Sequence, residues 1–403
     1  MKRRYETVIS DHFNNNRQML FLMGPRQVGK TTTSRESASS FDEHLYLNWD
    51  NQEHRELVLA GPAAVAGRMQ LERLREKTPL LILDEIHRYG RWKNFLKGLF
   101  DSYPEEMKIL VTGSARLDIF KAGGDSLMGR YFPYRMHPLS VAELVGTGIR
   151  EDPILQQPHR VDDDGFEALV RFGGFPEPFL RQEQRFSNRW RRLRSQQLFK
   201  EDLRDLTRIN ELDVVESLAE ILRRRSGQLT SYSSLARSVN ASVDSIRRWL
   251  VTLGSLYYCF AVRPWSRNIA RALRKEPKYY LWDWSIVEDS GQRAENLVAS
   301  ALLKAVHFWT DQGLGEFGLY FVRDKQKREV DFVVTREDRP WFLVEVKSSG
   351  AASLSPQLAY FQRQSGAAHA FQVALDLPFV DRNCFEEEKP VIVPARTFLA
   401  QMV

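Results

Sequence analysis

Apolar residues in the first 140 positions alternate between short continuous runs and segments with a three- or four-residue repeat. The continuous runs at 19–23, 80–83 and 107–112 predict strands that are buried on both faces of a parallel sheet. Apolar residues at helical spacing over 91–102 predict an amphipathic helix, and 32–38 predicts the start of another because it lacks Gly and Pro. We therefore expect an α/β fold in a β-α-β-α-β-α-β order, a doubly wound sheet with its ligand at the strand carboxyl ends.

The middle of the chain shows a different pattern, three amphipathic segments followed by an apolar run. The segments 212–225, 231–239 and 243–253 predict helices, and 256–262 predicts a strand. Ser242 is placed to cap the third helix at its amino end. This order is typical of a winged helix, which contacts DNA through its third helix or serves as a protein-interaction surface. The pattern leaves both roles open.

The first apolar run leads directly into Gly24-Pro25-Arg26-Gln27-Val28-Gly29-Lys30-Thr31, which satisfies G-x-x-x-x-G-K-[ST]. A strand before this motif and a helix after it are the context of a phosphate-binding P-loop, in which backbone N–H groups surround phosphate oxygens. Lys30 would reach the β- and γ-phosphates, and the Thr31 hydroxyl would bind Mg²⁺. The predicted cofactors are ATP and Mg²⁺, bound by Gly24, Pro25, Arg26, Gln27, Val28, Gly29, Lys30, Thr31 and Thr32. A Gly-rich turn without a ligand is the alternative for this motif alone.

The second apolar run ends in the acids that nucleotide hydrolysis requires. Asp84 would lie at the carboxyl end of this strand and hold Mg²⁺, and Glu85 would orient and deprotonate the attacking water. At the end of the run 107–112, Thr112 and Ser114 are candidates for sensing the γ-phosphate.

Phosphoryl transfer also needs a cation on the departing phosphate. Arg116 and Arg130 are the candidates, acting in the same chain or from a neighbouring subunit of a homo-oligomer, and ordinary surface arginines are the alternative. The predicted catalytic set is Glu85, Lys30, Arg130 and Ser114.

Length and composition set limits on the class of protein. The 403 residues suffice for two or three domains, and 43% hydrophobic with 27% charged residues describe a soluble globular chain. No apolar run is long enough to span a bilayer, and none follows the basic residues at 2–4, so we expect no membrane segment, no signal peptide and a cytoplasmic location. The two cysteines, Cys259 and Cys384, exclude a disulfide framework and a cysteine zinc site.

The net charge of +6 is unevenly distributed, because basic residues concentrate between positions 185 and 278. They are Arg185, Arg189, Arg191, Arg192, Arg194, Lys200, Arg223, Arg224, Arg225, Arg247, Arg248, Arg263, Arg267, Arg271, Arg274, Lys275 and Lys278. Such a concentration attracts a phosphate backbone, although solvated helix faces have the same composition. The predicted partner is nucleic acid, either DNA or an RNA–DNA hybrid, branched or single-stranded, contacted by Arg191, Arg192, Arg247 and Arg248.

A second group of acids lies near the carboxyl end. The segments 327–334 and 341–347 predict a hairpin, in which Glu345 and Lys347 share one face and Asp331 opposes them. Two carboxylates and a lysine on one sheet face can bind Mg²⁺ and activate water against a phosphodiester, and Glu295 on a preceding helix could complete the metal site. A charged hairpin facing water is the alternative, and whether such a site cuts stays open.

Together these motifs resemble a widespread group of bacterial and archaeal AAA-like P-loop ATPases with a carboxyl-terminal region long labelled as of unknown function. The matching residues are Gly24–Thr33, Leu80–Glu85, Thr112–Ala115, Ser126–Tyr131, Pro138–Ser140, Glu143, Gly173–Glu177, Pro277–Tyr280, Asp283, Glu295, Asp331 and Glu345–Lys347. The resemblance implies an N-terminal RecA/AAA-type P-loop sheet, a middle winged helix and a C-terminal PD-(D/E)xK nuclease-like α/β domain. One departure is that Glu329-Val330, and not a Pro-Asp pair, precede Asp331.

The expected domains are 1–150 for the ATPase, 151–210 for a helical linker or lid, 211–285 for the winged helix and 286–403 for the nuclease-like domain. Three functions fit, in this order of preference. The first is an ATPase that unwinds or remodels DNA, branched DNA or RNA–DNA hybrids. The second is an ATP-gated, metal-dependent nuclease of genome defence or repair, and the third is a nucleotide-dependent switch with an inactive nuclease-like binding domain.

Overall fold

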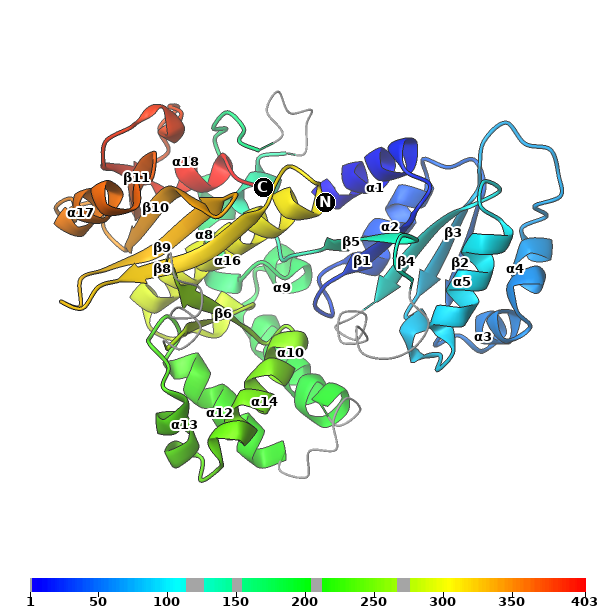
Figure 1. Cartoon of the computed structure of the whole chain (residues 1–403), viewed down its shortest axis with the longest axis horizontal. Helices are drawn as coiled ribbons and strands as arrows, with labels where there is room; N and C mark the ends of the chain where they lie inside the picture. The colour runs from blue at the N-terminus through cyan, green and yellow to red at the C-terminus, as the bar shows by residue number, and fades with distance from the viewer. Residues whose placement is uncertain (1, 114–126, 147–153, 204–211, 267–275) are drawn as a thin grey trace. The chain divides into compact units, whose positions relative to one another are not determined.

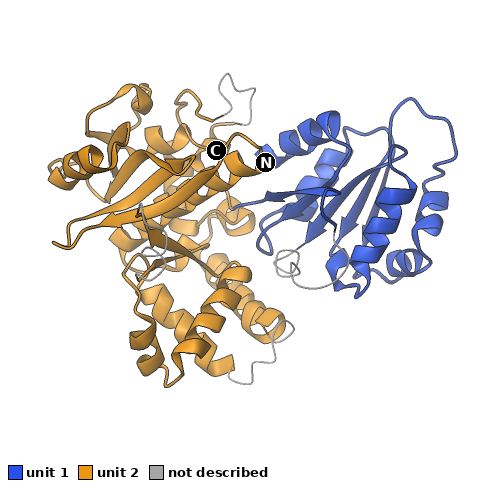
Figure 2. Ribbon diagram, viewed as in Figure 1, with its two compact units in different colours: residues 1–137 blue, residues 138–403 orange. Residues whose placement is uncertain are grey.

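The computed structural model describes residues 2–113, 127–146, 154–203, 212–266 and 276–403. The chain forms two compact units, residues 1–137 and 138–403, and Figure 2 shows each in its own colour. This division lies before the expected boundary at 150, and no further division coincides with 210 or 285. In the parts of the chain that are described, no helix has both the length and the apolar character needed to cross a membrane.

The first unit is built on a five-stranded sheet in the order β2-β3-β4-β1-β5, and every strand pairs in parallel with its neighbours. Its elements are α1 Arg4–Asn15, β1 Met19–Met23, α2 Lys30–Ala38, β2 His44–Asn48, α3 Gln52–Leu59, α4 Pro62–Arg68, β3 Leu80–Asp84, η1 Ile86–Arg88, α5 Trp92–Ser102, β4 Lys108–Gly113 and β5 Tyr131–Arg135. The predicted α/β sheet is confirmed for this part of the chain.

Continuous apolar runs form the central strands because both faces of this sheet are covered. One core cluster joins alternate strand residues, among them Phe21, Leu83 and Val111, to side chains of α3, α4 and α5. The intervening residues, such as Leu20 and Ile82, are also 0% exposed. On the other face α2 contacts β3 and β4, and α1 packs on α2 (Figure 1). The strand carboxyl ends are thereby fixed relative to the start of α2.

The second unit contains a seven-stranded mixed sheet in the order β12-β11-β10-β9-β8-β6-β7 (Figure 1). Its elements are α7 Val141–Leu144, α8 Asp163–Phe172, α9 Pro176–Arg181, α10 Gln184–Gln197, the π-helix η2 Leu198–Asp202, α12 Leu212–Arg224, α13 Tyr232–Ser238, α14 Val243–Ser255, β6 Cys259–Pro264, β7 Lys278–Leu281, η3 Trp284–Ile286, α16 Ser290–Asp311, β8 Phe317–Arg323, β9 Glu329–Arg336, β10 Arg339–Lys347, α17 Pro356–Ser365, β11 His369–Ala374, η4 Cys384–Glu386, β12 Val391–Pro394 and α18 Ala395–Ala400. Helix α16 contacts β7, β8, β9 and β10, and α17 contacts β9, β10 and β11.

The three middle helices α12, α13 and α14 lie where the periodicity predicts them, and the Ser242 side chain accepts a hydrogen bond from the Ser245 N–H at the start of α14. The strand expected at 256–262 begins later, at Cys259, because α14 extends to Ser255. Strand β6 pairs antiparallel with β7 and parallel with β8. The two strands that follow the three helices thus pair with each other and also continue the large sheet. The winged helix stays a prediction.

The hairpin predicted near the carboxyl end is present as β9 and β10, which pair antiparallel. Its turn is short, because only Glu337 and Asp338 lie between the strands, both with positive φ (48° and 60°). Two left-handed residues are characteristic of a type I′ turn, whose twist matches that of the flanking strands. This turn sets the register that brings the charged residues of β9 and β10 together.

Helix α16 also anchors the beginning of the second unit through the buried side chain of Lys304, which is 1% exposed. Its ammonium binds the carboxylate of Glu143 and donates to the Pro138 carbonyl (3.1 Å) and the Ser140 hydroxyl (3.0 Å). A buried cation needs such partners, because an unpaired charge in the interior is very unfavourable. Residues 138–143 are thus fixed to α16.

Candidate active site

The P-loop connects β1 to α2 in a conformation that depends on its glycines. A Cβ on Gly24 would overlap the carbonyl oxygen of Met136. Gly29 precedes α2 with φ 102°, a left-handed conformation that favours glycine. The loop therefore lies close against the backbone at Met136 and ends at the amino terminus of a helix, where backbone N–H groups and the helix dipole attract anions.

Lys30 is the first residue of α2 and is only 6% exposed. Its ammonium donates to two carbonyl oxygens of the loop itself, those of Gly24 (3.0 Å) and Pro25 (2.7 Å). The lysine thus lies across the loop that would surround the phosphates. Thr31 and Thr32, the next residues of α2, are exposed.

Asp84 is the point at which three strands and the P-loop helix meet. It ends β3, is 3% exposed, and accepts hydrogen bonds from the hydroxyl groups of Thr31 (2.8 Å), Tyr46 (2.7 Å) and Thr112. Burial raises the pKa of Tyr46 to about 12, and its hydrogen bond to Asp84 acts in the same direction. The tyrosine therefore stays a neutral donor. Its role has no motif in the sequence, because it depends on β2 and β3 being neighbours.

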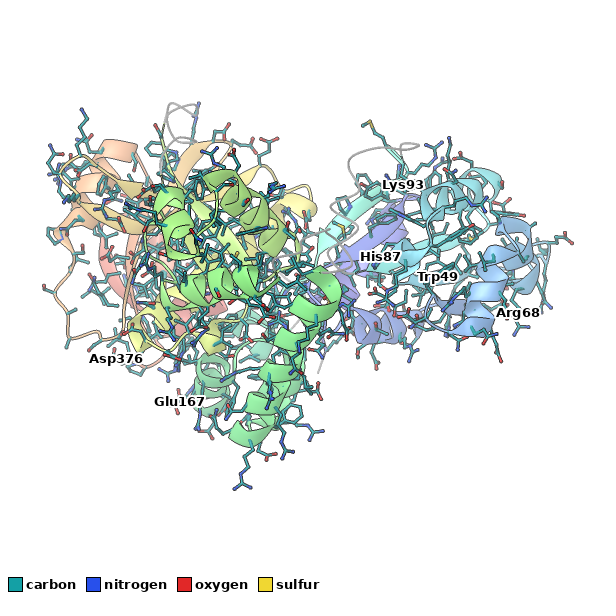
Figure 3. All side chains as sticks on the ribbon, turned by 90° about the horizontal axis from the view of Figure 1, so that it is seen from below. Trp49, Arg68, His87, Lys93, Glu167 and Asp376 are labelled. Atoms are coloured by element: carbon teal, nitrogen blue, oxygen red, sulfur yellow. The ribbon has the colours of Figure 1, made fainter. Side chains whose placement is uncertain are left out.

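Glu85 follows Asp84 in a left-handed conformation (φ 56°) and leaves the strand direction at once. Its N–H donates to the Thr112 carbonyl (3.1 Å), and its carboxylate lies 3.4 Å from Nε2 of His87, a side chain labelled in Figure 3. Burial raises the pKa of Glu85; the charge of Lys30 opposes this shift and that of Asp84 adds to it. A carboxylate with a raised pKa accepts a proton more readily, as a general base must.

Arg3 links the P-loop to the segment after β5, a role that the sequence did not indicate. Arg3 as a whole is 5% exposed. Its guanidinium donates hydrogen bonds to the carbonyls of Val28 (2.7 Å) and His137 (2.7 Å). Tyr5 adds a second link, donating to the Arg135 carbonyl (2.7 Å) and accepting from the His137 N–H (3.0 Å). No local pattern could have indicated these contacts, because they join residues more than 20 positions apart.

Arg130 does not lie near the P-loop of its own unit. It precedes β5, and its carbonyl accepts from the N–H of Met19, the first residue of β1, at the amino edge of the sheet. Its guanidinium makes two hydrogen bonds to Asp101, of 2.8 and 2.9 Å. This position argues against Arg130 acting on the nucleotide of its own chain, since the P-loop is at the carboxyl edge of the sheet. Action from a neighbouring subunit stays a prediction. Of the other candidates, Thr112 contacts Asp84, and Ser114 and Arg116 lie outside the described residues.

The residues at the carboxyl edge of the first sheet, where the P-loop lies, fit a nucleoside triphosphate with Mg²⁺. Gly24 provides a position without a side chain, Lys30 supplies a cation, and Thr31 and Asp84 present two oxygen ligands that already share a hydrogen bond of 2.8 Å. Hydroxyl and carboxylate oxygens are the ligands that Mg²⁺ prefers. Asp84, Glu85, Lys30 and Thr31 are thus brought together as predicted from their positions along the chain.

The second group of acids surrounds a lysine that was not predicted to belong to it. Lys278, the first residue of β7, is 3% exposed, and its ammonium lies 2.7 Å from Glu329, 3.3 Å from Glu295 and 3.7 Å from Asp331. Tyr280 donates to Glu295 (2.6 Å) from the same strand. Although burial opposes it, the pKa of Lys278 is raised by the surrounding carboxylates, so the ammonium remains charged.

Glu345 and Lys347 lie beside this cluster on β10. Their side chains form an ion pair of 2.8 Å, and Asp331 on the adjacent strand accepts from the Val346 N–H (2.9 Å). Burial, followed by the charge of Asp331, raises the pKa of both Glu345 and Glu295 to about 7. The predicted residues Glu295, Asp331, Glu345 and Lys347 thus come from α16, β9 and β10 to one region of the second unit.

This cluster does not fit a divalent metal as it stands. Among the residues that the structure describes, no group of three or more His, Cys, Asp or Glu side chains is arranged to hold a metal ion. The physical reason is that the Lys278 ammonium lies between Glu295, Glu329 and Asp331 and takes the place that a metal cation would occupy among these carboxylates. The expectation of a metal site at Glu295, Asp331 and Glu345 overlooked this lysine, because its place depends on the pairing of β7 with β6 in the sheet.

The predicted nucleic-acid contacts differ in how accessible they are. Arg247 and Arg248 are exposed on α14, where Arg247 lies 3.6 Å from Asp244 and Arg248 donates to Ser245 (3.3 Å). Arg192 on α10 is exposed, whereas Arg191 on the same helix is partly buried.

Other basic residues of the same region are held by acids. Arg223 binds Glu220 (2.7 Å) and Glu288 (2.8 Å), and its hydrogen bond lowers the pKa of Glu220 to about 2. Part of the positive charge counted in the sequence is therefore neutralised within the fold. Arg267, Arg271, Arg274 and Lys275 lie outside the described residues.

Three parts of the chain match known protein families. Residues 16–145 match a family described as AAA domain, residues 163–291 match a domain of unknown function (DUF8612), and residues 290–385 match another (DUF4143). Two uncharacterized proteins, one from Mycobacterium bovis and one from Mycobacterium tuberculosis, are each 26% identical over 345 residues, which cover 84% of this chain and 72% of theirs. The part of the chain that contains the P-loop, Asp84 and Glu85 is therefore similar to an AAA-type P-loop ATPase domain.

Solved structures that the chain matches include AMPPCP-bound DnaA from Aquifex aeolicus, at 13% identity and a TM-score of 0.31, with 61% of this chain and 86% of that chain covered. A second is Drosophila ORC bound to AT-rich DNA and Cdc6, at 11% identity and a TM-score of 0.25, with 73% and 90% covered. Similarity at this level adds nothing to the site described above.

Proposed function

We propose that this protein is a Mg²⁺-dependent ATPase that uses ATP hydrolysis to unwind or remodel nucleic acid. The observation that carries the ATPase assignment is the contact between Thr31 and Asp84, with Glu85 as the next residue. A hydroxyl at the start of the P-loop helix and a carboxylate at the end of a neighbouring strand are the two protein oxygens that an ATP-bound Mg²⁺ requires.

Each residue of this edge has a distinct role in the proposal. The P-loop backbone and Lys30 bind and orient the phosphates, while Thr31 and Asp84 hold Mg²⁺, which neutralises phosphate charge when bound. Glu85 positions a water molecule and accepts its proton, which its burial favours. Tyr46 and Thr112 keep the Asp84 carboxylate in place through their hydrogen bonds.

Nucleic acid as the substrate is supported by exposed arginines of the second unit. Arg247 and Arg248 lie on α14, and that helix follows α13 in the order typical of a helix-turn-helix. Arg192 is exposed on α10. Arginine side chains of this kind bind phosphates in a manner that weakens with increasing salt.

The carboxyl-terminal cluster has a binding or structural role in this proposal, and metal-dependent cleavage is the less favoured candidate. Lys278 carries the positive charge among Glu295, Glu329 and Asp331 that a metal would otherwise supply. Among the described residues this cluster is therefore proposed to act without an arranged metal site.

The test is an ATPase assay with single-stranded, duplex, hybrid and branched nucleic acids, performed on the full chain, Lys30→Ala and a Lys77→Ala control. Lys77 pairs with Asp42 at the surface, so the control should behave as the unmodified protein. We expect stimulation by at least one nucleic acid and loss of turnover in Lys30→Ala. ATP turnover that is indifferent to every nucleic acid would reject the proposed substrate and retain the ATPase assignment.

Binding by α14 is tested with Arg247→Ala/Arg248→Ala and with Arg363→Ala, a control on α17. Loss of phosphate contacts should weaken nucleic-acid binding and lower the slope of log affinity against log salt by about 1 per arginine. Unchanged affinity and slope would exclude α14 from the interface.

A further inference from the structure

The second unit contains a cavity of about 610 Å³ between α10, α12 and η3. Five arginines contribute to its lining, three of them from α10 and two from α12 and α16: Arg191, Arg192, Arg194, Arg223 and Arg293. The size is within the range of small-molecule sites, which runs from about 300 to 1,000 Å³. A pocket with this many cations must balance their charge with its own acids or with a ligand.

Two of the arginines are held by hydrogen bonds within the fold. Arg223 binds the carboxylates of Glu220 and Glu288, and Arg293 donates to the carbonyls of Val287 (2.8 Å) and Glu288 (3.2 Å). These two arginines form part of a fixed wall. Arg223 makes four hydrogen bonds and has little donor capacity left for a ligand, whereas Arg293, within the described residues, donates only to these two carbonyl oxygens of Val287 and Glu288.

Arg191 and Arg194 have fewer partners and lie three residues apart on α10, on the same side of the helix. Arg191 makes one long hydrogen bond, of 3.4 Å, to the Arg171 carbonyl, and its buried Nε has no hydrogen-bond partner in the described part of the chain. Arg194 forms an ion pair with Asp283, in which Nη1 of the arginine lies 3.5 Å from Oδ2 of the carboxylate. Burial lowers the pKa of both guanidinium groups, and the negative charge of Asp283 opposes this for both.

The residues that hold Arg194 are Phe175, in the motif Gly173–Glu177, and Asp283, and the ATPase site uses neither. The guanidinium lies 3.8 Å from the centre of the Phe175 ring, in the motif Gly173–Glu177. Asp283 receives hydrogen bonds from the Ser285 N–H and hydroxyl, and a Cβ on Gly173 would come within 2.9 Å of its Oδ1. Arg194 and Asp283 are therefore both held in the wall of the cavity.

We propose that this cavity binds the phosphate group of a nucleotide-sized ligand, with Arg191 and Arg194 as its donors. Two guanidinium groups with spare N–H donors suit a phosphate, which accepts charge-assisted hydrogen bonds from several directions. Leu198, Phe199 and Tyr258 supply an apolar wall for the remainder of the ligand. The source is either a free nucleotide or the terminal nucleotide of a strand, and the inference rests on the proposed function only in the second case.

The experiment measures binding of four probes to the full chain by calorimetry: dTMP, thymidine, and a thymidine hexanucleotide with and without a 5′-phosphate. The absence of Mg²⁺ keeps occupancy of the P-loop low, because the site proposed there binds its nucleotide together with the metal. We expect phosphate-dependent binding of dTMP, of the phosphorylated strand or of both. In Arg191→Met this binding should weaken about tenfold or more, because charge-assisted hydrogen bonds are lost.

The control is Arg189→Met, an exposed arginine of the same helix that does not line the cavity. Its affinity for the probes should equal that of the unmodified protein. Arg191→Met is preferred over Arg194→Met because Arg194 packs on Phe175, and equal unfolding temperatures would show that Arg191→Met is folded.

Thymidine binding as tightly as dTMP, equal affinities in Arg191→Met and Arg189→Met, or no binding of either phosphorylated probe would overturn the proposal. Binding of dTMP alone identifies a free nucleotide as the ligand class, and binding of the phosphorylated strand alone identifies a strand end. The ATPase assay with nucleic acids is independent of these results. The proposed function can therefore be rejected while phosphate binding in the cavity is retained, and phosphate binding can be rejected while the proposed function is retained.

Discussion

The Cα of Gly24 lies so close to the backbone of Met136 that a methyl group on Gly24 would overlap the Met136 carbonyl oxygen. The Met136 N–H in turn donates to the carbonyl of Met23, the last residue of β1 (2.6 Å). The start of the P-loop is thus packed directly against the segment that follows β5. Neither backbone can move away without loss of the sheet register.

Gly24→Ala should therefore abolish nucleotide binding and lower the free energy of unfolding of the first unit by about 1–3 kcal/mol, a typical cost of overpacking. Thermal unfolding and titration with a fluorescent ATP analogue would measure the two effects. The matched control is Gly67→Ala in α4, where an added Cβ meets nothing within 4 Å. Its stability should be unchanged or higher by up to about 1 kcal/mol. Normal nucleotide affinity in Gly24→Ala would contradict the close packing.

Glu85→Gln should lower ATP turnover by about 10²- to 10⁴-fold and leave ATP affinity within a few-fold, because the amide cannot accept the proton of water. Glu53→Gln, an exposed acid of α3, serves as the control. Since burial raises the pKa of Glu85, turnover should decline on acidification at a higher pH than an exposed glutamate would give. A variant that hydrolyses ATP at the normal rate would exclude Glu85 as the base.

The cluster around Lys278 should make the stability of the second unit depend on pH. The pKa values of Glu295 and Glu345 are raised to about 7, so the folded state binds protons that the unfolded state has released. The stabilisation from these protons is complete below the unfolded pKa, near 4.5, and is lost as the pH rises through about 7. Denaturant unfolding should accordingly show lower stability at pH 8 than at pH 6.

Glu345→Gln should reduce this difference, because the amide remains neutral throughout. Glu386→Gln, an exposed residue of η4, should keep the full difference. Equal stability of the unmodified protein at pH 6 and pH 8 would show that these carboxyl groups titrate normally.

Lys278→Met should convert the cluster into a metal site. Removal of the ammonium leaves Glu295, Glu329 and Asp331 facing one another, so their mutual repulsion should lower the unfolding temperature most at pH 8. Added Mn²⁺ should then raise the unfolding temperature of Lys278→Met and have no such effect on the unmodified protein. Equal stabilisation of Lys278→Met and the unmodified protein by Mn²⁺ would mean that a metal displaces the Lys278 ammonium from the carboxylates. The metal-dependent nuclease would then be the better-supported function.

Continuous apolar runs and helical periodicity predicted the parallel sheet of the first unit and the three helices α12, α13 and α14. They did so because each of these elements is amphipathic, or buried on both faces, over its own length. The P-loop and Asp84-Glu85 were recognisable because their spacing relative to a strand end fixes their position. Local patterns of this kind can be recognised in a single sequence.

Contacts between distant segments were not predictable in this way. Lys278 was counted as one more surface cation, and its place among three carboxylates depends on β7 pairing with β6 and on α16 crossing the sheet. Arg3 resembles any basic residue near an amino terminus, yet it binds the Val28 and His137 carbonyls. Arg130 was linked to the nucleotide by residue type alone, and the parallel pairing of β5 with β1 places it at the opposite edge.

The pairing of β6 with both β7 and β8 has a consequence for how this chain can be divided or recombined. A fragment beginning at residue 286 would lose two strands and leave the edge of β8 without a partner, and unpaired edges promote aggregation. A fragment ending at 285 would carry two strands with no sheet to join. The three-helix segment and the sheet therefore belong to one folded unit, and an exchange between related proteins should succeed only when its crossover point lies near the boundary of that unit, between residues 137 and 138.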